Sequence, residues 1–358
     1  MGAPSINVLF KQTGITAIKR GERGIVVLLL KDTVPATNPI VMSTVSDMPA
    51  TLSAENKEQI TLAFMGYEKP PLEVIAYIVA EDTTDYTAAQ HYLETIKWDY
   101  FAFPEIADAD VNTFATWIKS LRETIDKKVK AVLPNCAGDN EGIINSSNLK
   151  NVVGSKIYTA KEYCSRLAGI FAGTPLTISA TYAPLSELTD CDHLTKSEMD
   201  TAVDAGKLIL MNDGKKVKIV RAVNSLITTT ADKGSIFKKI KIVDIMDQIH
   251  DDIKSTVSDS YIGKVPNDYD HKVLLMSAIG GYFDQLELAG LLDKGKSSVY
   301  IDLESQAAYL KSVGTDTSTM SEQEIKEANT EDKVFIAAKV KILDAMEDIN
   351  LNIAVYEV

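Results

Sequence analysis

Short apolar runs alternate with helix-like patterns through the first half of this 358-residue chain. Ile25 to Leu30 is a continuous apolar run, which is typical of a strand covered on both faces. Further strands are predicted at Glu73 to Val79, Tyr100 to Phe103 and Val129 to Leu133. Strands separated by helices at this spacing indicate βαβ units with right-handed crossovers. We therefore expect a larger α/β domain with a mostly parallel sheet and helices on both of its faces.

The helices between these strands are predicted from capping residues and from the period of the apolar side chains. Ser53 is a candidate N-cap for a helix that runs through Met65 and ends at Gly66. Another helix is expected from Thr87 to Ile96, and one from Asp110 to Ile125. The last of these has one apolar stripe, formed by Val111, Phe114, Ile118, Leu121 and Ile125. The polar segment from Asp139 to Ser147 is predicted to be a loop, and Thr159 to Phe171 a helix.

The pattern changes near Lys207, where two short apolar runs flank the turn sequence Asn212-Asp213-Gly214. Two long helices are predicted next, one over Ile242 to Val257 and one over Asp270 to Ala289, with Gly290 as its C-cap. A strand at Val299 to Leu303, a short helix at Ser305 to Leu310 and an extended segment at Val334 to Asp344 complete this α+β region. The expected organisation is an N-terminal strand arm at 1–20, an α/β domain at 21–206, an α+β domain at 207–345 and a C-terminal strand arm at 346–358.

Both ends of the chain alternate apolar and other residues with period two, as in a strand with one buried face. The N-terminal set is Ile6, Val8 and Phe10, and the C-terminal set is Leu351, Ile353 and Val355. Two interpretations are open. The segments are edge strands of the chain's own sheet, or they pair in trans with the sheet of a neighbouring subunit.

The composition limits the classes of partner. The net charge of −13 argues against nucleic acid as a partner. The longest apolar run is far shorter than the roughly 20 residues that cross a bilayer, and no signal peptide opens the sequence, so we expect no direct membrane insertion and a cytoplasmic origin. The three cysteines have no metal-binding spacing. We expect no cofactor and no metal.

One motif suggests an enzyme. Gly290 to Ser297 matches the phosphate-loop pattern G-x-x-x-x-G-K-[ST]. A phosphate loop follows a strand and opens a helix, whereas here a predicted helix precedes the motif and a predicted strand follows it. A helix C-cap followed by a lysine-containing turn is the simpler interpretation. A cytosolic α/β nucleotide-binding enzyme that uses this loop is the alternative function.

Charged residues are unevenly distributed. Between Asp213 and Lys241, eight basic residues and two acidic residues give a local charge of 8 − 2 = +6 in an acidic protein. Asp302 to Asp332 is predominantly acidic. Such patches suit a protein that docks onto copies of itself or onto a charged partner, and ordinary solvated faces also produce them. The candidate basic patch consists of Lys215, Lys216, Lys218, Lys238, Lys239 and Lys241.

Several stretches resemble the sheath proteins of contractile phage tails and of phage-tail-like bacteriocins (tailocins). They are Gly169 to Leu176 (GIFAGTPL), Ala205 to Leu208 (AGKL), Lys216 to Leu226 (KVKIVRAVNSL) and Asp344 to Glu347 (DAME). The likeness covers most of the chain, from about Gly21 to its end, and is closest to short sheath subunits of the R-type kind. It rests on patterns in the expected order and includes no catalytic signature.

The resemblance implies a structural subunit and no enzyme. Such sheaths are stacked six-membered rings around an inner tube, and their contraction drives the tube through a cell envelope. The implied partners are other copies of the chain, the tube protein, and baseplate and tail terminator proteins. The terminal arms would pair with sheets of adjacent subunits, and the basic patch is a candidate surface for the tube. The family's larger domain is subtilisin-like, but Pro175 stands where that fold's serine nucleophile would be, so fold kinship implies no protease activity. The subunit would be assembled in the bacterial cytoplasm and released by lysis within a virion or phage-tail-like particle.

Overall fold

The computed structural model describes residues 17–356, which form two compact units. The larger unit comprises Gly21–His250 and the described residues from Asp344 onward. The smaller unit comprises Asp251–Leu343 and the described residues before Gly21. The boundary expected at Lys207 falls inside the larger unit, because Lys207 and Leu208 form a strand that pairs with the main sheet. Each unit is described by itself.

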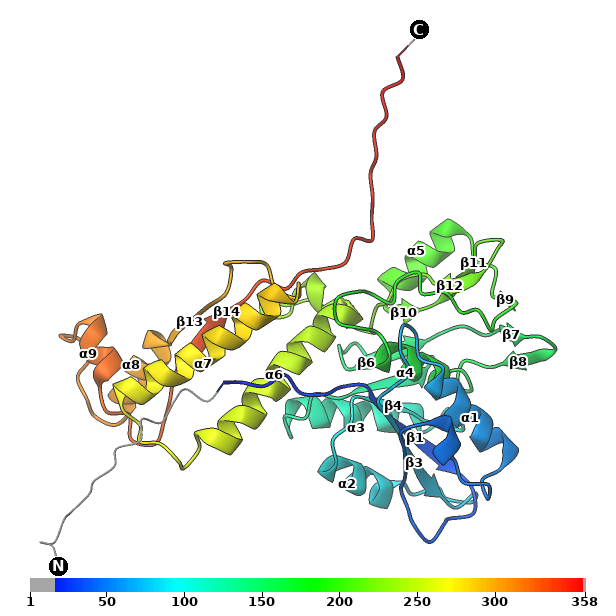
Figure 1. The fold of residues 1–358 in the computed structure, drawn as a ribbon, viewed down its shortest axis with the longest axis horizontal. Coiled ribbons are helices and arrows are strands. Elements are labelled where there is room, and N and C mark those ends of the chain that lie inside the picture. The colour runs from blue at the N-terminus through cyan, green and yellow to red at the C-terminus, as the bar shows by residue number, and fades with distance from the viewer. Residues whose placement is uncertain (1–16, 357–358) are drawn as a thin grey trace, which may run out of the picture. The chain divides into compact units, whose positions relative to one another are not determined.

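The larger unit is organised around a seven-stranded sheet in the order β10-β6-β5-β4-β1-β3-β2 (Figure 1). All neighbouring strands are parallel except β2, which runs antiparallel to β3. The mostly parallel sheet predicted from the sequence is therefore confirmed. The strands are β1 (Ile25–Lys31), β2 (Ile40–Met42), β3 (Glu73–Val79), β4 (Tyr100–Ala102), β5 (Lys130–Pro134), β6 (Ile143–Ser146) and β10 (Lys207–Leu208).

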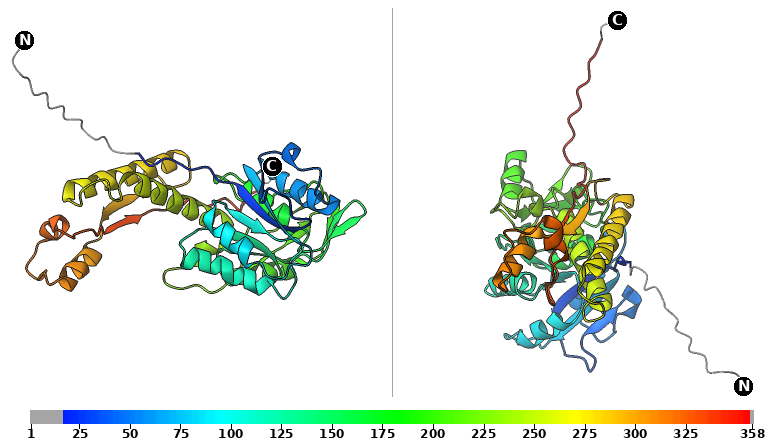
Figure 2. Two further views of the ribbon diagram at one scale, coloured as in Figure 1. Left: turned by 90° about the horizontal axis from the view of Figure 1, so that it is seen from below. Right: turned by 90° about the vertical axis from the view of Figure 1, so that its left-hand side faces the viewer.

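Helices cover both faces of this sheet, as Figure 2 shows from two further directions. Successive side chains of β1 point to opposite faces, so Val26, Leu28 and Leu30 join one hydrophobic cluster while Val27 and Leu29 join the other. Because both faces are buried, the strand is apolar throughout and needs no alternation. One cluster includes α1 (Ala54–Phe64) and α4 (Cys164–Ala172), and the other includes α2 (Thr87–Thr95) and α3 (Val111–Glu123).

Helices α1 and α4 meet almost backbone to backbone. A Cβ atom at Gly169 would lie 2.0 Å from the carbonyl oxygen of Ala63, and one at Gly173 would lie 2.0 Å from the carbonyl oxygen of Lys69. Real Cβ atoms do not approach other atoms this closely, so both positions require glycine. Packing thus explains the two glycines of the GIFAGTP stretch.

Two sequence predictions in the larger unit were wrong. The segment Asp139 to Ser147 was expected to be a polar loop, but it contains β6, whose Asn145 and Ser146 are buried. Backbone pairing with β5 and β10 gives this polar stretch its place inside the sheet. Ile125 was assigned to the buried stripe of α3, but the helix ends at Glu123 and Ile125 is exposed.

Smaller sheets surround the main one within the larger unit. Strands β7 (Asn151–Val153), β8 (Lys156–Tyr158) and β9 (Asp190–Cys191) form an antiparallel sheet in the order β8-β7-β9. The predicted hairpin around Asn212-Asp213-Gly214 is confirmed as β11 (Leu210–Asn212) and β12 (Val217–Ile219). The remaining elements are α5 (Lys196–Asp204) and the short 3-10 helices η1 (Val45–Asp47) and η2 (Ser235–Lys238).

The smaller unit combines helices with one small sheet. Helix α6 (Ile240–Ser260) begins in the larger unit and ends in the smaller one, where α7 (Tyr269–Leu288) follows. Strands β13 (Ser298–Ile301) and β14 (Ile336–Lys339) pair antiparallel beside α7 (Figure 1). Two short helices, α8 (Leu303–Ser312) and α9 (Glu322–Glu327), lie between these strands in the sequence. Among the described residues, none of the helices combines the length and the apolar character that crossing a bilayer requires.

Candidate functional site at the root of the C-terminal arm

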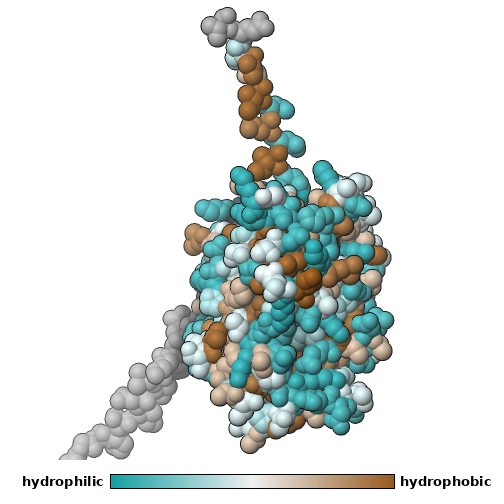
Figure 3. Space-filling view, turned by 90° about the vertical axis from the view of Figure 1, so that its right-hand side faces the viewer, coloured by the Kyte–Doolittle hydropathy of each residue, from teal (hydrophilic) through white to brown (hydrophobic). Residues whose placement is uncertain are grey.

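The final described segment of the chain, residues 349–356, is extended and contains neither helix nor strand. Its apolar side chains are almost fully accessible: Leu351 is 76% exposed, Ile353 75% and Val355 89%. Figure 3 shows this segment as a largely hydrophobic protrusion. Exposed apolar side chains in strand-like alternation mark a segment that would lose unfavourable hydration on pairing. We call residues 349–356 the arm.

Glu347, two residues before the arm, is firmly held. Its Oε1 accepts hydrogen bonds from Thr181 Oγ1 at 2.6 Å and Ser179 Oγ at 3.0 Å, and its Oε2 accepts one from Lys239 Nζ at 3.1 Å. Only 6% of the side chain is exposed. Hydrogen bonds and an ion pair compensate the desolvation of this carboxylate.

Two neighbouring acids extend this anchor toward the solvent. Asp344 accepts from Lys239 Nζ at 2.5 Å, and Asp348 accepts from Arg221 Nη2 at 2.7 Å. The exposed fraction of the side chain is 6% at Glu347, 39% at Asp344 and 76% at Asp348. We call Asp344, Glu347 and Asp348 the arm root.

The arm root raises the pKa of both of its basic partners. Burial lowers the pKa of the Lys239 ammonium, but its hydrogen bonds to Asp344 and Glu347 outweigh that effect. The hydrogen bond from Arg221 to Asp348 raises the pKa of the guanidinium, against a smaller opposing effect of burial. Both cations therefore stay charged at neutral pH and hold the acidic side chains.

Three separate segments of the larger unit supply the partners of the arm root. Ser179 and Thr181 follow α4, Arg221 follows β12, and Lys239 immediately precedes α6. Thr181 also ties two of these segments together, because its Oγ1 accepts a hydrogen bond from the backbone N–H of Ala222 at 3.0 Å. Residues distant in the sequence thus converge on Glu347.

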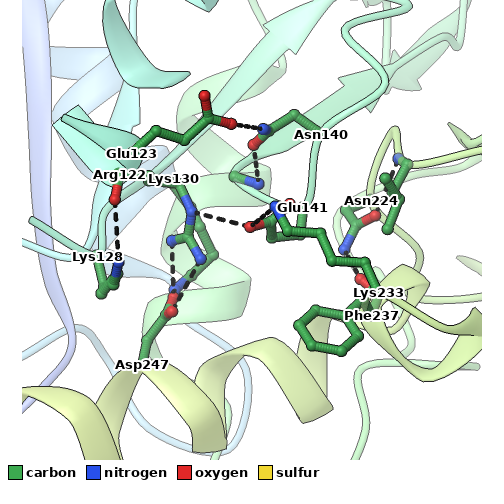
Figure 4. A network of polar contacts seen from close by, with 12 residues as sticks. Arg122, Glu123, Lys128, Lys130, Asn140, Glu141, Asn224, Lys233, Phe237 and Asp247 are labelled. Carbon is green, nitrogen blue, oxygen red and sulfur yellow. Dashed lines mark hydrogen bonds and ion pairs between the residues drawn. The ribbon is translucent and has the colours of Figure 1, made fainter. Parts of the chain in front are cut away.

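A buried ion network fixes the start of α6 to the sheet (Figure 4). Arg122 holds Asp247 with two parallel hydrogen bonds, from Nη1 to Oδ2 at 3.0 Å and from Nη2 to Oδ1 at 2.9 Å. Lys130 on β5 bridges Asp247 at 2.5 Å and Asp244 at 3.1 Å. Tyr100 on β4 donates its hydroxyl to Asp244 at 2.6 Å. We call these residues the α6 network.

Charges in the α6 network are stabilised by one another. Burial raises the pKa of Asp247, but the nearby Arg122 and Lys130 outweigh it and lower that pKa to about 2. Burial also lowers the pKa of Arg122, and the carboxylate of Asp247 raises it above its ordinary value. Arg122 and Asp247 therefore remain ionised at neutral pH and hold α6, the helix that Lys239 immediately precedes.

The candidate basic patch does not form one continuous charged surface. Lys215 and Lys216 are exposed in the β11–β12 turn, whereas Lys218 pairs with Asp213 at 2.6 Å and lies over the ring of Tyr182. Lys239 belongs to the arm-root contacts and Lys241 is buried. Lys238 is half-buried in η2. The predicted arm residues Ile6, Val8 and Phe10 lie outside the described residues.

The phosphate-loop match at Gly290 to Ser297 has the wrong context. It follows α7 and precedes β13, as the sequence order indicates. Its amide N–H groups donate to protein oxygens: Leu291 to Leu286 O, Asp293 to Lys341 O and Gly295 to the Glu287 carboxylate. Because these donors are already paired within the protein, the nucleotide-binding interpretation is not supported. Among residues 17–356, no three His, Cys, Asp or Glu side chains are grouped so that they could hold a metal ion.

Sequence reasoning identified the alternating arm residues but missed the arm root. The acids Asp344, Glu347 and Asp348 precede the arm closely, and such a group of acids before an apolar strand was an available signal. Their partners Ser179, Thr181 and Lys239 carried no local pattern. Only the fold brings them together.

Comparison with known proteins identifies the class. The phage tail sheath protein central domain matches residues 80–225, and the phage tail sheath C-terminal domain matches residues 232–356. A tail sheath protein of Clostridium phage phiCD119 is 40% identical over 357 residues, covering 98% of this chain and 99% of the relative. The chain belongs to the phage tail sheath family.

Solved structures share the fold. The sheath tail protein of Desulfitobacterium hafniense superimposes with a TM-score of 0.70 at 19% identity, covering 83% of this chain and 94% of that chain. A chain of the contracted helical sheath of the anti-feeding prophage superimposes with a TM-score of 0.72 at 12% identity, covering 99% of each. The expected sheath relationship is confirmed, and the family membership gives no support to the alternative of a nucleotide-binding enzyme.

Proposed function

We propose that this protein polymerises as stacked six-membered rings around an inner tube, and that contraction of the resulting sheath drives the tube through a cell envelope. The observation that carries the proposal is an arm that is anchored through Glu347 and largely exposed from Leu351 to Tyr356, in a chain of the sheath family. An anchored root with an unpaired strand-like end suits a subunit that holds its neighbour.

The sheet of the smaller unit is a suitable receptor for a neighbour's arm. Strands β13 and β14 pair only with each other in the part of the chain that the structure describes. Each strand therefore offers a free edge for strand addition. Backbone hydrogen bonds contribute only about 0.5–1.5 kcal/mol each, but several per arm repeated over many subunits connect a lattice firmly. The N-terminal arm, including Ile6, Val8 and Phe10, would pair in the same manner.

Contraction would then be a rigid-body rearrangement in which contacts between subunit bodies change while the arms stay paired. The α6 network and the arm root support this view, because they fix the start of the arm to the body of its own subunit. Baseplate and tail terminator proteins would cap the sheath. The particle, a virion or a phage-tail-like bacteriocin, would be assembled in the cytoplasm and released by lysis. A subtilisin-like ancestry of the larger unit belongs to the same proposal and brings no protease activity, since Pro175 carries no hydroxyl.

Deletion of residues Leu351 to Val358 tests the role of the arm. The truncated protein should remain folded by circular dichroism and monomeric by size exclusion, and it should form no tubes under negative-stain electron microscopy. A matched control replaces Asn350 and Asn352 by serine, which leaves the apolar alternation intact and should preserve the tubes. Tubes formed by the truncated protein would contradict the proposal.

We also propose that the basic patch faces the inner tube. Lys215 and Lys216 are its most accessible members in the described chain, whereas Lys239 is engaged by the arm root. Reversing Lys238, Lys239 and Lys241 to Glu would therefore disturb the arm as well. Reversing Lys215 and Lys216 to Glu is the more specific test, and it should reduce co-assembly with the tube while sheath-only assembly persists. Unchanged co-assembly would count against this surface.

A further inference from the structure

The chain enters the larger unit at Gly21, directly after the predicted N-terminal arm, and the C-terminal arm follows the arm root. We call Gly21, Glu22 and Arg23 the entry segment. In the proposed sheath both terminal arms carry load. The entry segment and the arm root are therefore the places where that load would reach the larger unit, and their contacts indicate which element receives it.

Helix α6 holds the entry segment through a largely buried ion pair. Arg23 Nη2 lies 3.0 Å from Asp244 Oδ2, and the exposed fractions of the two side chains are 14% and 5%. One helical turn further on, Gln248 Nε2 donates to the carbonyl oxygen of Gly21 at 3.4 Å. Residues four apart lie on the same face of a helix, so one face of α6 contacts both ends of the entry segment.

Asp244 divides its two carboxylate oxygens between the entry segment and the main sheet. Its Oδ2 faces Arg23, whereas its Oδ1 accepts from the hydroxyl of Tyr100 at 2.6 Å and lies 3.1 Å from Lys130 Nζ. Burial lowers the pKa of Arg23, and the carboxylate of Asp244 outweighs this effect and raises that pKa above its ordinary value. The ion pair is therefore present at neutral pH and joins the entry segment to the α6 network.

The arm root is attached to the same end of α6. Lys239 immediately precedes the helix and donates to Glu347 at 3.1 Å and to Asp344 at 2.5 Å. Asp244 follows Lys239 by 244 − 239 = 5 residues. Because an α-helix rises about 1.5 Å per residue, the two anchors are only about 8 Å apart along the helix axis. The two ends of the larger unit are thus held at the first turns of one helix.

The entry segment and the residues after it also have contacts that do not involve α6. Lys97 Nζ donates to the carbonyl oxygen of Glu22 at 2.8 Å in an exposed position. Directly after the entry segment, the backbone N–H groups of Gly24 and Ile25 donate to the carboxylate of Asp99 at 2.6 and 2.8 Å. The Asp99 contacts hold the start of β1. The exposed Lys97 contact contributes little because water can replace it, so this lysine offers a matched control.

We propose that Asp244 and Lys239 are positioning residues, which together fix the entry segment and the arm root to the first turns of α6, so that a pull on either arm reaches the subunit at this helix. The inference rests on the proposed function for the load, but the geometry is a property of the single subunit. The distance between the entry segment and the arm root should therefore be the same in the free subunit and in the assembled sheath. Any change in the direction of an arm would occur outside these two segments.

Paired spin labels test this geometry. Cysteines introduced at two exposed positions, Glu22→Cys and Met346→Cys, can be labelled selectively because the native thiols of Cys136, Cys164 and Cys191 are buried. Double electron–electron resonance on the free subunit should give one narrow distribution of the distance between the two labels. Tubes assembled with an excess of unlabelled protein, which dilutes the distances between neighbouring subunits, should give the same distribution.

Neutral variants test the role of α6. Arg23→Met releases the entry segment from Asp244 and should replace the narrow peak with a broad distribution. Lys239→Met releases the arm root and should have the same effect. Lys97→Met removes the exposed contact of the entry segment and should leave the peak narrow.

A second label pair reports on the fold. Glu55→Cys on α1 and Asn112→Cys on α3 are exposed, and the distance between their labels should stay narrowly distributed in every variant. If circular dichroism shows that Arg23→Met does not fold, the milder Gln248→Ala takes its place. It removes the contact with the carbonyl oxygen of Gly21 and should broaden the first distribution to a smaller extent.

The outcomes distinguish this inference from the proposed function. A narrow distribution in a folded Arg23→Met or Lys239→Met variant would overturn the positioning role, and so would equal broadening by Lys97→Met. Different distances in the free subunit and in tubes would also overturn it, while leaving the proposed assembly intact. Absence of tubes in the parent protein would contradict the proposed function, whereas the labels on the free subunit would still decide the geometry.

Discussion

The α6 network and the arm root use the same chemistry, carboxylates held by lysine and arginine, in different surroundings. In the α6 network, Arg122, Lys130, Asp244 and Asp247 are all buried. In the arm root, the exposed fraction rises from 6% at Glu347 to 76% at Asp348. The α6 network is therefore shielded from water, whereas the arm root is partly exposed to it.

This difference in burial indicates which contacts can be exchanged. Removing one partner from a buried pair leaves an uncompensated charge, whereas an exposed pair contributes little because water and salt replace it. The α6 network therefore belongs to the permanent body of the subunit. The arm root changes from a fixed point at Glu347 to a releasable contact at Asp348. A sheath subunit of the proposed kind needs both.

The largest effect is expected from Arg122→Met. It leaves Asp247 buried beside Lys130 alone and should lower the free energy of unfolding by about 3–5 kcal/mol. Urea denaturation followed by circular dichroism measures this. Lys196→Met, which removes an exposed pair with Asp200, is the matched control and should cost less than about 0.5 kcal/mol. A loss of stability below about 1 kcal/mol for Arg122→Met would mean that the buried Asp247 does not depend on Arg122.

Acid should weaken the larger unit through Asp247. The pKa of its carboxyl is about 2 in the folded protein and about 3.9 in an unfolded chain. The unfolded state therefore binds more protons between these values, so the stabilisation is complete above about pH 4 and is lost as the pH falls toward 2. Urea titrations at pH 5, 4 and 3 should show this loss, and Asp247→Asn should reduce the slope. An equal slope in both proteins would assign the acid sensitivity to other groups.

Glu347→Gln should have an intermediate and local effect. The amide keeps one acceptor for Ser179 and Thr181 but loses the ion pair with Lys239, which should cost about 1–2 kcal/mol. Since the arm lies outside the core, global unfolding should hardly change. Hydrogen exchange of residues 344–350 should become faster, while β1 and β3 stay protected. Unchanged exchange would show that the anchor does not depend on Glu347.

Asp348→Asn should have the smallest effect. Its pair with Arg221 is largely exposed, so stability should change by less than about 0.5 kcal/mol. Exchange should accelerate only beyond residue 347, in contrast to Glu347→Gln. If both variants accelerate the exchange of the same residues equally, Glu347 and Asp348 do not differ in how firmly they hold the arm.

Sequence reasoning recovered the parts of the fold that local chemistry determines. Strands β1 and β3 were predicted because they are apolar on both faces, α1 because Ser53 caps it, and the β11–β12 hairpin because Asn212-Asp213-Gly214 favours a turn. Strand β6 was missed because its buried Asn145 and Ser146 resemble loop residues. Their place depends on pairing with β5 and β10, which no local pattern encodes.

The same limit applied to the candidate site. The alternation of Leu351, Ile353 and Val355 was readable, because strand periodicity is local. The environment of Glu347 was not readable, because Ser179, Thr181 and Lys239 reach it only through the fold of the larger unit. The basic patch was read from local charge alone, which did not show that Lys239 pairs with Asp344 and Glu347, acids that lie far away in the sequence.

The glycine contacts between α1 and the end of α4 have a mechanical consequence. Where Gly169 faces Ala63 and Gly173 faces Lys69, main chain touches main chain with no side chain between them. Side chains under compression can change rotamer, but a backbone contact has no such freedom. This joint therefore makes the larger unit stiff along the line from α1 to α4. In the proposed sheath, a subunit built in this way would transmit a load to its neighbours instead of absorbing it by internal deformation.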